Sequence, residues 1–148
     1  MAKLDEHTLA TWRAFLTAHA RVTKRISKDL AAAGLPDLTW YDVLWALYSA
    51  PERRLRIREL ADAVALSSTG MTRFVDRLER AGYVTREAVP GDRRGAFAVI
   101  TDSGAELLRQ MWPIYARGIQ EYFEPALAAA PAQLRSALER ASAAASGR

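Results

Sequence analysis

The most informative segment of the chain is residues 67–84, which read SSTGMTRFVDRLERAGYV. Its apolar side chains recur three and four positions apart, the spacing of a helix with one buried face: Met71, Phe74, Val75 and Leu78. Ser67 is the expected N-cap of this helix, and Gly82 is its expected C-cap. The pattern therefore predicts a helix to about Ala81 whose outer face is polar: Ser68, Thr69, Thr72, Arg73, Asp76, Arg77 and Arg80.

The neighbouring segments extend this helix into a larger motif. A shorter helical pattern from Ile57 to Ala65 precedes it, and the two patterns together predict a helix-turn-helix. Two strand-like stretches follow, at residues 83–89 and 96–100. The six residues between them, PGDRRG at 90–95, are rich in turn formers and place two arginines at the tip of the predicted hairpin.

The N-terminal part of the chain predicts two helices. Residues 8–33 have apolar side chains or histidine at helical spacing: Leu9, Trp12, Phe15, Leu16, His19, Val22, Ile26 and Leu30. Gly34 and Pro36 should end this helix, because glycine accepts the left-handed C-cap conformation and proline does not continue a helix. Thr39 is the expected N-cap of a second helix that reaches about Ser49.

The C-terminal part also predicts two helices. Thr101 is the expected cap of a long helix in which Pro113 should cause a kink or a break. A last helix should begin near Pro131, and residues 141–148 should fray. The expected fold is thus mainly α with a small β-hairpin wing, a winged helix-turn-helix domain with additional helices at both ends.

The net charge is concentrated in the centre of the chain. The whole chain has a formal charge of +4, and residues 53–94 alone contain ten arginines against six acidic residues, so this segment holds the entire excess. Such a segment favours a polyanionic partner, although a solvated arginine-rich surface has the same composition. The absence of cysteine excludes disulfides, thiolate metal sites and cysteine nucleophiles.

The helix and the hairpin fit the two grooves of DNA. A recognition helix needs small polar groups and arginine near its N-terminus, where they reach base edges and phosphates. Arginine at the tip of a ribbon can enter the narrow minor groove, and Asp92 could hold one of the guanidinium groups of Arg93 and Arg94 while the other contacts DNA. The alternative is an ordinary surface helix with ion pairs such as Asp76–Arg80 and a charged turn. That alternative does not explain why the charge excess falls on these elements, so double-stranded DNA is the expected partner.

Residues 67–84 resemble the recognition helix and first wing strand of MarR-family transcriptional regulators. PGDRRG at 90–95, followed by TDSG at 101–104, is similar to the family's wing and to the start of its fifth helix. The Asp-Arg-Arg turn followed by Thr-x-x-Gly is the most specific part of a resemblance that covers nearly the whole chain. It implies a winged-helix homodimer that binds a palindromic operator, usually as a repressor relieved by a small ligand.

The resemblance also implies residue roles. Thr72 and Arg73 would read the major groove, Ser67 and Ser68 would touch phosphate, and Arg94, braced by Asp92, would enter the minor groove. The full expected DNA-binding set is Ser67, Ser68, Thr69, Thr72, Arg73, Arg77, Arg86, Asp92, Arg93 and Arg94. Within a single domain of residues 1–148, the DNA-binding region would be 53–100. The helices within 8–50 and 101–145 would supply the dimer interface and the ligand pocket.

The sequence narrows the class of effector. Peroxide sensing through cysteine is excluded, and two histidines twelve positions apart, His7 and His19, disfavour a metal sensor, so no cofactor or metal is expected. Aromatic residues, Trp112 included, are frequent on the helices that form the family's pocket, and such a lining favours a planar organic ligand. The residues expected to bind this ligand are Trp12, His19, Trp40, Tyr41, Trp45 and Tyr115. The alternative is that these residues belong to the core or to the dimer interface, and that His19 is a core histidine.

Other functional classes have less support. An enzyme is disfavoured because no nucleophile–base pair, phosphate-binding glycine loop, pair of inward acids or metal triad is present. A winged helix used only for protein–protein contact remains an alternative. The apolar faces of residues 8–33 and 105–138 exceed what a small winged domain covers, which predicts a homodimer. No apolar run approaches the roughly 18–20 residues of a membrane span, and the start of the chain lacks a signal peptide's apolar region, so a cytoplasmic protein is expected.

Overall fold

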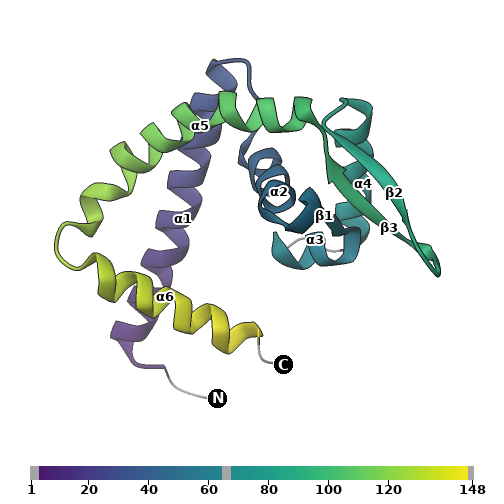
Figure 1. Cartoon of the computed structure of the whole chain (residues 1–148). Coiled ribbons are helices and arrows are strands. Elements are labelled where there is room, and N and C mark those ends of the chain that lie inside the picture. The colour runs from purple at the N-terminus through teal and green to yellow at the C-terminus, as the bar shows by residue number, and fades with distance from the viewer. Residues whose placement is uncertain (1–3, 65–67, 147–148) are drawn as a thin grey trace. The chain divides into compact units, whose positions relative to one another are not determined.

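The computed structural model describes residues 4–64 and 68–146, apart from the side chains of Ser68 and Thr69. The described chain is mainly helical with a small sheet, as predicted (Figure 1). The elements follow in this order: α1 (Glu6–Ala32), α2 (Leu38–Ser49), the 3-10 turn η1 (Pro51–Arg53), β1 (Arg54–Arg56), α3 (Ile57–Ala63), α4 (Ser68–Arg80), β2 (Val84–Val89), β3 (Asp92–Ile100), α5 (Asp102–Tyr122), the 3-10 turn η2 (Glu124–Leu127) and α6 (Pro131–Ser146).

The chain forms two compact units. The winged unit consists of Ser27–Ile114, and the terminal unit consists of the residues before Ser27 together with those after Ile114. The winged unit therefore includes α2 and the first part of α5 in addition to residues 53–100. Within the described residues, no helix combines the length and the apolar character needed to cross a membrane.

The core of the winged unit lies where α2, α3, α4 and α5 meet the sheet. Each of these elements contributes side chains that are almost completely buried: Val43, Leu44, Leu47, Leu60, Met71, Val75, Leu78, Val84, Ala98 and Met111. Full burial of a side chain the size of leucine stabilises the fold by roughly 1.5–3 kcal/mol, so this core fixes α4 on the sheet. Of the predicted inner face of residues 67–81, Met71, Val75 and Leu78 are buried, whereas Phe74 is only half-buried.

The sheet has three antiparallel strands in the order β1-β3-β2, so the prediction of a two-stranded hairpin missed one strand. Arg54 and Arg56 of β1 pair with Val99 and Phe97 of β3. Figure 1 shows the hairpin of β2 and β3 projecting beyond the helices of the winged unit. β1 escaped prediction because two of its three residues are arginines, which leaves no alternation of apolar and polar side chains to detect.

The hairpin turn is tighter than the predicted connection over residues 90–95. β3 begins at Asp92, which pairs with Val89, so only Pro90 and Gly91 separate the strands. Gly91 has a φ of +77°, and proline followed by such a glycine is the usual composition of a type II turn. The tip arginines therefore belong to a strand and not to a loop.

Most helix boundaries follow the predicted capping residues. Thr101 caps α5, because its Oγ1 accepts the Gly104 N–H at 3.1 Å. Gly82 has a φ of +82° and ends α4, as predicted. The predicted N-cap of α2 was wrong: Asp37 fills that position and accepts the Thr39 N–H at 2.9 Å. The predicted cap Ser67 lies outside the described residues.

The terminal unit contains the first part of α1, the end of α5, and α6. α1 crosses α5 at Ile26, where Gly118 leaves so little room that a Cβ atom would lie 2.5 Å from Ile26 Cγ1. Arg25 Nε donates a hydrogen bond to the Tyr122 hydroxyl at 3.2 Å. A close apolar contact and a polar contact thus both stabilise this crossing.

The C-terminal helices are more continuous than the sequence predicts. α5 runs through Pro113 without a break, which was one of the two expected outcomes, the other being a kink. Pro113 lies on the exposed side of the helix, where water can satisfy the carbonyl group that proline leaves unpaired. α6 starts at Pro131 as predicted but continues to Ser146. The residues expected to fray are thus helical as far as Ser146, because alanine has the highest helix propensity.

Candidate nucleic-acid interface

The outer face of α4 presents polar and basic side chains. Thr72, Arg73, Arg77 and Arg80 are polar residues of this face, whereas Met71, Val75 and Leu78 between them face the core. Ser68 and Thr69 belong to the first turn of α4, but their side chains are not described, and Ser67 lies outside the described residues. The part of the predicted DNA-binding face that can be inspected is therefore turned outward as expected.

Arg73 and Arg77 of α4 differ in their surroundings. Arg73 is exposed, and within residues 4–64 and 68–146 its side chain forms no ion pair, so its guanidinium group is available to a partner. The guanidinium carbon of Arg77 lies 5.4 Å from the centres of both the Trp40 and the Phe74 rings. This contact orients the Arg77 side chain and leaves its N–H edge available.

Arg86 of β2 is the most heavily engaged arginine of the site. Its Nη2 donates a hydrogen bond to Asp76 Oδ1 at 2.6 Å, and its Nη1 donates to Glu79. Nη2 also approaches the Thr72 carbonyl oxygen at 3.4 Å. Partial burial lowers the pKa of Arg86, but the hydrogen bonds to Asp76 and Glu79 outweigh this effect and leave the pKa above its usual value. Asp76 thus pairs with Arg86 and not with Arg80, the partner that the alternative of an ordinary surface helix gave it.

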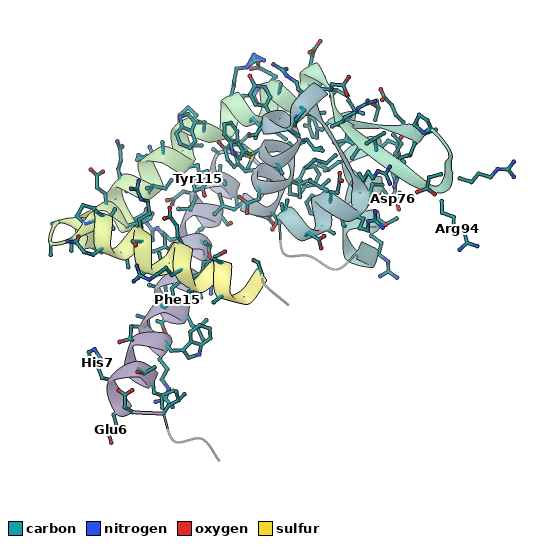
Figure 2. All side chains as sticks on the ribbon, turned by 60° about the horizontal axis from the view of Figure 1, so that its bottom comes forward. Glu6, His7, Phe15, Asp76, Arg94 and Tyr115 are labelled. Carbon is teal, nitrogen blue, oxygen red and sulfur yellow. The ribbon has the colours of Figure 1, made fainter. Side chains whose placement is uncertain are left out.

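The wing tip exposes Arg93 and Arg94, and Figure 2 shows Arg94 pointing away from the ribbon. Asp92 does not bind either guanidinium group. Its Oδ1 accepts the backbone N–H groups of Arg94 at 3.0 Å and Gly95 at 3.1 Å. The carboxylate therefore braces the backbone of Arg94 and leaves both guanidinium groups in solvent.

Arg56, the last residue of β1, reaches the Asp92 carboxylate of the wing, a contact that the sequence analysis missed. Its Nη1 lies 3.9 Å from Asp92 Oδ2, and its guanidinium group lies 6.0 Å from the centre of the Phe97 ring. No local pattern connects position 56 with position 92, because the contact exists only through the pairing of β1 with β3. Arg56 thus supports the carboxylate that braces Arg94.

Arg54 ties the outer strand to the wing. It donates hydrogen bonds to Glu87 at 3.0 Å and Glu52 at 2.8 Å. The hydrogen bond to Glu87 is the main cause that raises the pKa of Arg54; burial opposes it and Glu52 adds to it. Its guanidinium also lies 4.5 Å from the centre of the Phe97 ring. The charge of Arg54 is therefore balanced by carboxylates of the protein itself.

The aromatic residues of the winged unit fall into two groups. Trp40 packs edge-on against Phe74 and Tyr83, with ring centres 5.7 and 6.1 Å apart, so it supports α4. The second group, which we call the aromatic ladder, is a continuous stack of Trp112, Tyr41, Trp45 and Tyr48, with neighbouring ring centres 5.9–6.3 Å apart. Trp45 and Trp112 are each 50% exposed, so the ladder presents aromatic surface to solvent.

The other predicted ligand residues belong to the terminal unit. Trp12 is 55% exposed, and its ring centre lies 5.9 Å from that of Phe15. His19 is exposed and is not a core histidine of this chain. Tyr115 is half-buried (Figure 2). The six predicted residues are thus divided between the two units.

Two of the hollows in the described part of the chain are not lined by any predicted ligand residue. An apolar groove of about 540 Å³ in the terminal unit lies between the end of α5 and α6; its apolar lining includes Phe123, Leu127, Leu134 and Leu138. A polar hollow of about 430 Å³ lies at the start of α5, beside Tyr83. Among the described residues, no three histidine, aspartate or glutamate side chains are grouped as metal ligands.

Comparison with known proteins identifies the family. Residues 33–95 match the model of the MarR family. The chain is 30% identical to AbsC, a MarR family transcriptional regulator from Streptomyces coelicolor, and the two structures superpose over the full length of both chains with a TM-score of 0.86. The chain belongs to the MarR family.

Two further relatives agree with this assignment. The MarR-family chain is 31% identical over 118 residues to the HTH-type transcriptional regulator YkoM of Bacillus subtilis, a match that covers 80% of this chain and 75% of that protein. It is 30% identical to Sco3205, a MarR family transcriptional regulator from Streptomyces coelicolor whose structure was solved in complex with DNA. That similarity covers 97% of this chain and 90% of that one, with a TM-score of 0.83.

The family assignment settles the class of function. Like its relatives, the protein is a DNA-binding transcriptional regulator; it is not an enzyme. Its winged helix-turn-helix exposes arginines on α4 and on the wing, which agrees with that class. The predicted fold, family and functional class are all confirmed.

Proposed function

We propose that this MarR-family regulator is a homodimer that binds a palindromic operator as a repressor and is released by a small planar aromatic ligand. The observation that supports operator binding best is the contrast among the arginines of the winged unit. Arg73 on α4 and Arg94 on the wing are exposed and form no ion pair with any described residue, whereas Arg54 and Arg86 are engaged within the protein. Arg73 and Arg94 lie on the elements that enter the major and minor grooves in winged helices.

The roles of individual residues follow from this placement. Thr72 and Arg73 would contact base edges, while Ser67, Ser68, Thr69 and Arg77 would contact phosphates. Arg94, presented by the Asp92 turn, would enter the minor groove, and Arg93 would add backbone charge. We propose that this activity takes place in the cytoplasm, as expected for a regulator that binds chromosomal DNA.

The dimer is supported by the apolar surface of the terminal unit. Large apolar side chains that are more than one third exposed are found at both ends of the chain, among them Trp12, Phe15, Leu16, Leu134 and Leu138. The apolar groove adds further uncovered surface. A second copy of the chain is the partner that would cover such a surface symmetrically and pair two α4 helices on a palindrome.

The aromatic ladder supports the effector class. Trp45 and Trp112 expose half of their surface although each stacks on Tyr41. An additional planar ring would gain contact area and stacking energy against such a surface. Trp40 is already packed between Phe74 and Tyr83, so the ladder is the better candidate for the ligand contact.

Selection of bound fragments from genomic DNA tests the operator proposal. The fragment that binds best, and a random duplex of equal length, are then titrated at several salt concentrations. We expect a preference for the selected fragment of roughly 10³-fold or more and a steep salt dependence for both duplexes. Equal affinity for the two duplexes would contradict the operator; binding to neither would contradict the DNA role itself. Transcription from the selected site, with and without the protein, distinguishes repression from activation.

A further inference from the structure

Arg86 links the recognition helix to the wing. β2 is tied on one side to α4 through Arg86 and on the other to β1 through Glu87, which pairs with Arg54 at 3.0 Å. This opposite placement follows from the alternation of side chains along a strand. The wing strand is therefore held by ion pairs on both of its faces.

The partners of Arg86 lie one helical turn apart. Asp76 and Glu79 are spaced i and i+3 on α4, so one guanidinium group reaches both carboxylates. Asp76 lies on the side of α4 nearest the wing strands (Figure 2). The Arg86 side chain is 28% exposed, less than the 42% of either carboxylate, so the guanidinium group lies beneath its partners.

We propose that Arg86 is a positioning residue, and not a DNA contact: it fixes the wing against α4 and neutralises the two carboxylates of the recognition helix. This inference rests on the proposed operator binding. It replaces the DNA-binding role that the sequence analysis gives Arg86, because both of its terminal nitrogens already donate hydrogen bonds within the protein.

The charge of α4 explains why neutralisation matters. The helix has three arginines, Arg73, Arg77 and Arg80, against Asp76 and Glu79. Without Arg86, two unpaired carboxylates would lie close to a surface that must approach phosphates, within the Debye length of about 8 Å. DNA affinity should therefore fall even though no DNA contact has been removed.

A mutational cycle separates this role from a direct contact. Four proteins are compared: the unmodified chain, Arg86→Gln, the pair Asp76→Asn with Glu79→Gln, and the triple variant. We call the Asp76→Asn, Glu79→Gln pair the neutral pair. Each protein is titrated with the selected operator fragment and a random duplex at several salt concentrations. Arg93→Gln serves as a matched control, because it removes one exposed arginine that forms no ion pair with the described residues.

If Arg86 acts through the carboxylates, its effect depends on their charge. Arg86→Gln should then weaken operator binding about tenfold in the unmodified chain but less than threefold when it is added to the neutral pair. The salt slope of the neutral pair should be unchanged by the addition of Arg86→Gln. Arg93→Gln should lower the slope by about 0.9, as expected for a lost phosphate contact.

A direct contact gives the opposite result. The same loss of affinity in both backgrounds, with a salt slope lowered by about 0.9 as in Arg93→Gln, would overturn the proposal. If a thermal melt shows that Arg86→Gln alone is unfolded, comparison of the operator affinities of the neutral pair and the triple variant still tests the proposal. Both of these variants lack the two carboxylates, so the effect of Arg86→Gln between them reports a direct DNA contact alone. The preference of the unmodified protein for its operator tests the proposed function separately from this cycle.

Discussion

Gly104 shows how one residue fixes the start of α5 on the turn that follows α4. The Thr101 hydroxyl donates to the Gly82 carbonyl oxygen at 2.7 Å, and the Thr101 N–H donates to the Tyr83 carbonyl oxygen at 3.0 Å. This approach is so close that a Cβ atom on Gly104 would lie 2.4 Å from the Tyr83 carbonyl oxygen. The glycine is needed here for space and not for its backbone freedom.

We therefore predict that Gly104→Ala destabilises the protein by about 1–3 kcal/mol, because the added methyl group must displace backbone and not a flexible side chain. Urea denaturation followed by circular dichroism measures the change. Ser103→Ala, an exposed exchange in the same helical turn, should stay within about 0.5 kcal/mol of the unmodified protein. Equal stability of both variants would mean that α5 moves away from Tyr83 at no cost.

A second glycine has a role in binding and not in stability. A Cβ atom on Gly95 would lie 2.5 Å from Asp92 Oδ2, the carboxylate that accepts the backbone N–H groups of Arg94 and Gly95 itself. Gly95→Ala should displace this carboxylate and weaken DNA binding roughly three- to tenfold, since Arg94 loses its fixed backbone. The melting temperature should change little, because the turn is exposed. An unaltered affinity in a DNA titration would remove the Asp92 turn from the presentation of Arg94.

At the scale of elements, the sequence predicted the helices well because their apolar residues repeat at helical spacing and their ends have capping residues. It missed β1, since Arg54-Leu55-Arg56 contains a single apolar residue and its pairing with β3 joins positions far apart in the chain. The sequence also predicted an arginine-rich surface, but it could not show which of these arginines form ion pairs within the protein. Arg54 is engaged by Glu87 and Arg86 by Asp76, contacts that exist only after the sheet has formed.

Substitutions of Arg73 and Arg94 should affect DNA binding differently. If Arg73 on α4 reads bases, as we propose, Arg73→Ala should cost about 1–3 kcal/mol on the operator and flatten its preference over random DNA. If Arg94 on the wing acts through the minor-groove potential, Arg94→Ala should weaken both duplexes and lower the salt slope by about one. Titrations of both variants at several salt concentrations measure these effects, and wild-type behaviour in both would remove α4 and the wing tip from the interface.

At the scale of the whole molecule, the exposed apolar side chains of the terminal unit predict the assembly state. Light scattering at micromolar concentration should give about twice the chain mass of 16.4 kDa. Leu134→Glu with Leu138→Glu places two charges on the apolar groove of α6 and should reduce the mass toward that of one chain. A single-chain mass for the unmodified protein would contradict the dimer and, with it, the palindromic form of the operator.

The last prediction concerns release by a ligand. A dimer binds successive major grooves only when its two α4 helices are about 34 Å apart, so a releasing ligand must favour a different spacing. The usual coupling of about 1–3 kcal/mol would weaken operator binding roughly 5- to 150-fold, and linkage requires that operator weaken ligand binding by the same factor. Planar aromatic carboxylates, phenols and heterocycles are the compounds to screen, because each could stack on the aromatic ladder.

Tryptophan fluorescence reports on this binding directly. A compound that releases the operator should quench the emission of the half-exposed Trp45 and Trp112, and the quenching should shrink in Trp45→Phe. Trp40→Phe is the matched control, since Trp40 is packed against Phe74 and Tyr83 and should respond less. Release with undiminished quenching in Trp45→Phe would place the ligand away from the ladder. If no compound of these classes alters operator binding, the ligand-gated form of the proposal fails while DNA binding stands.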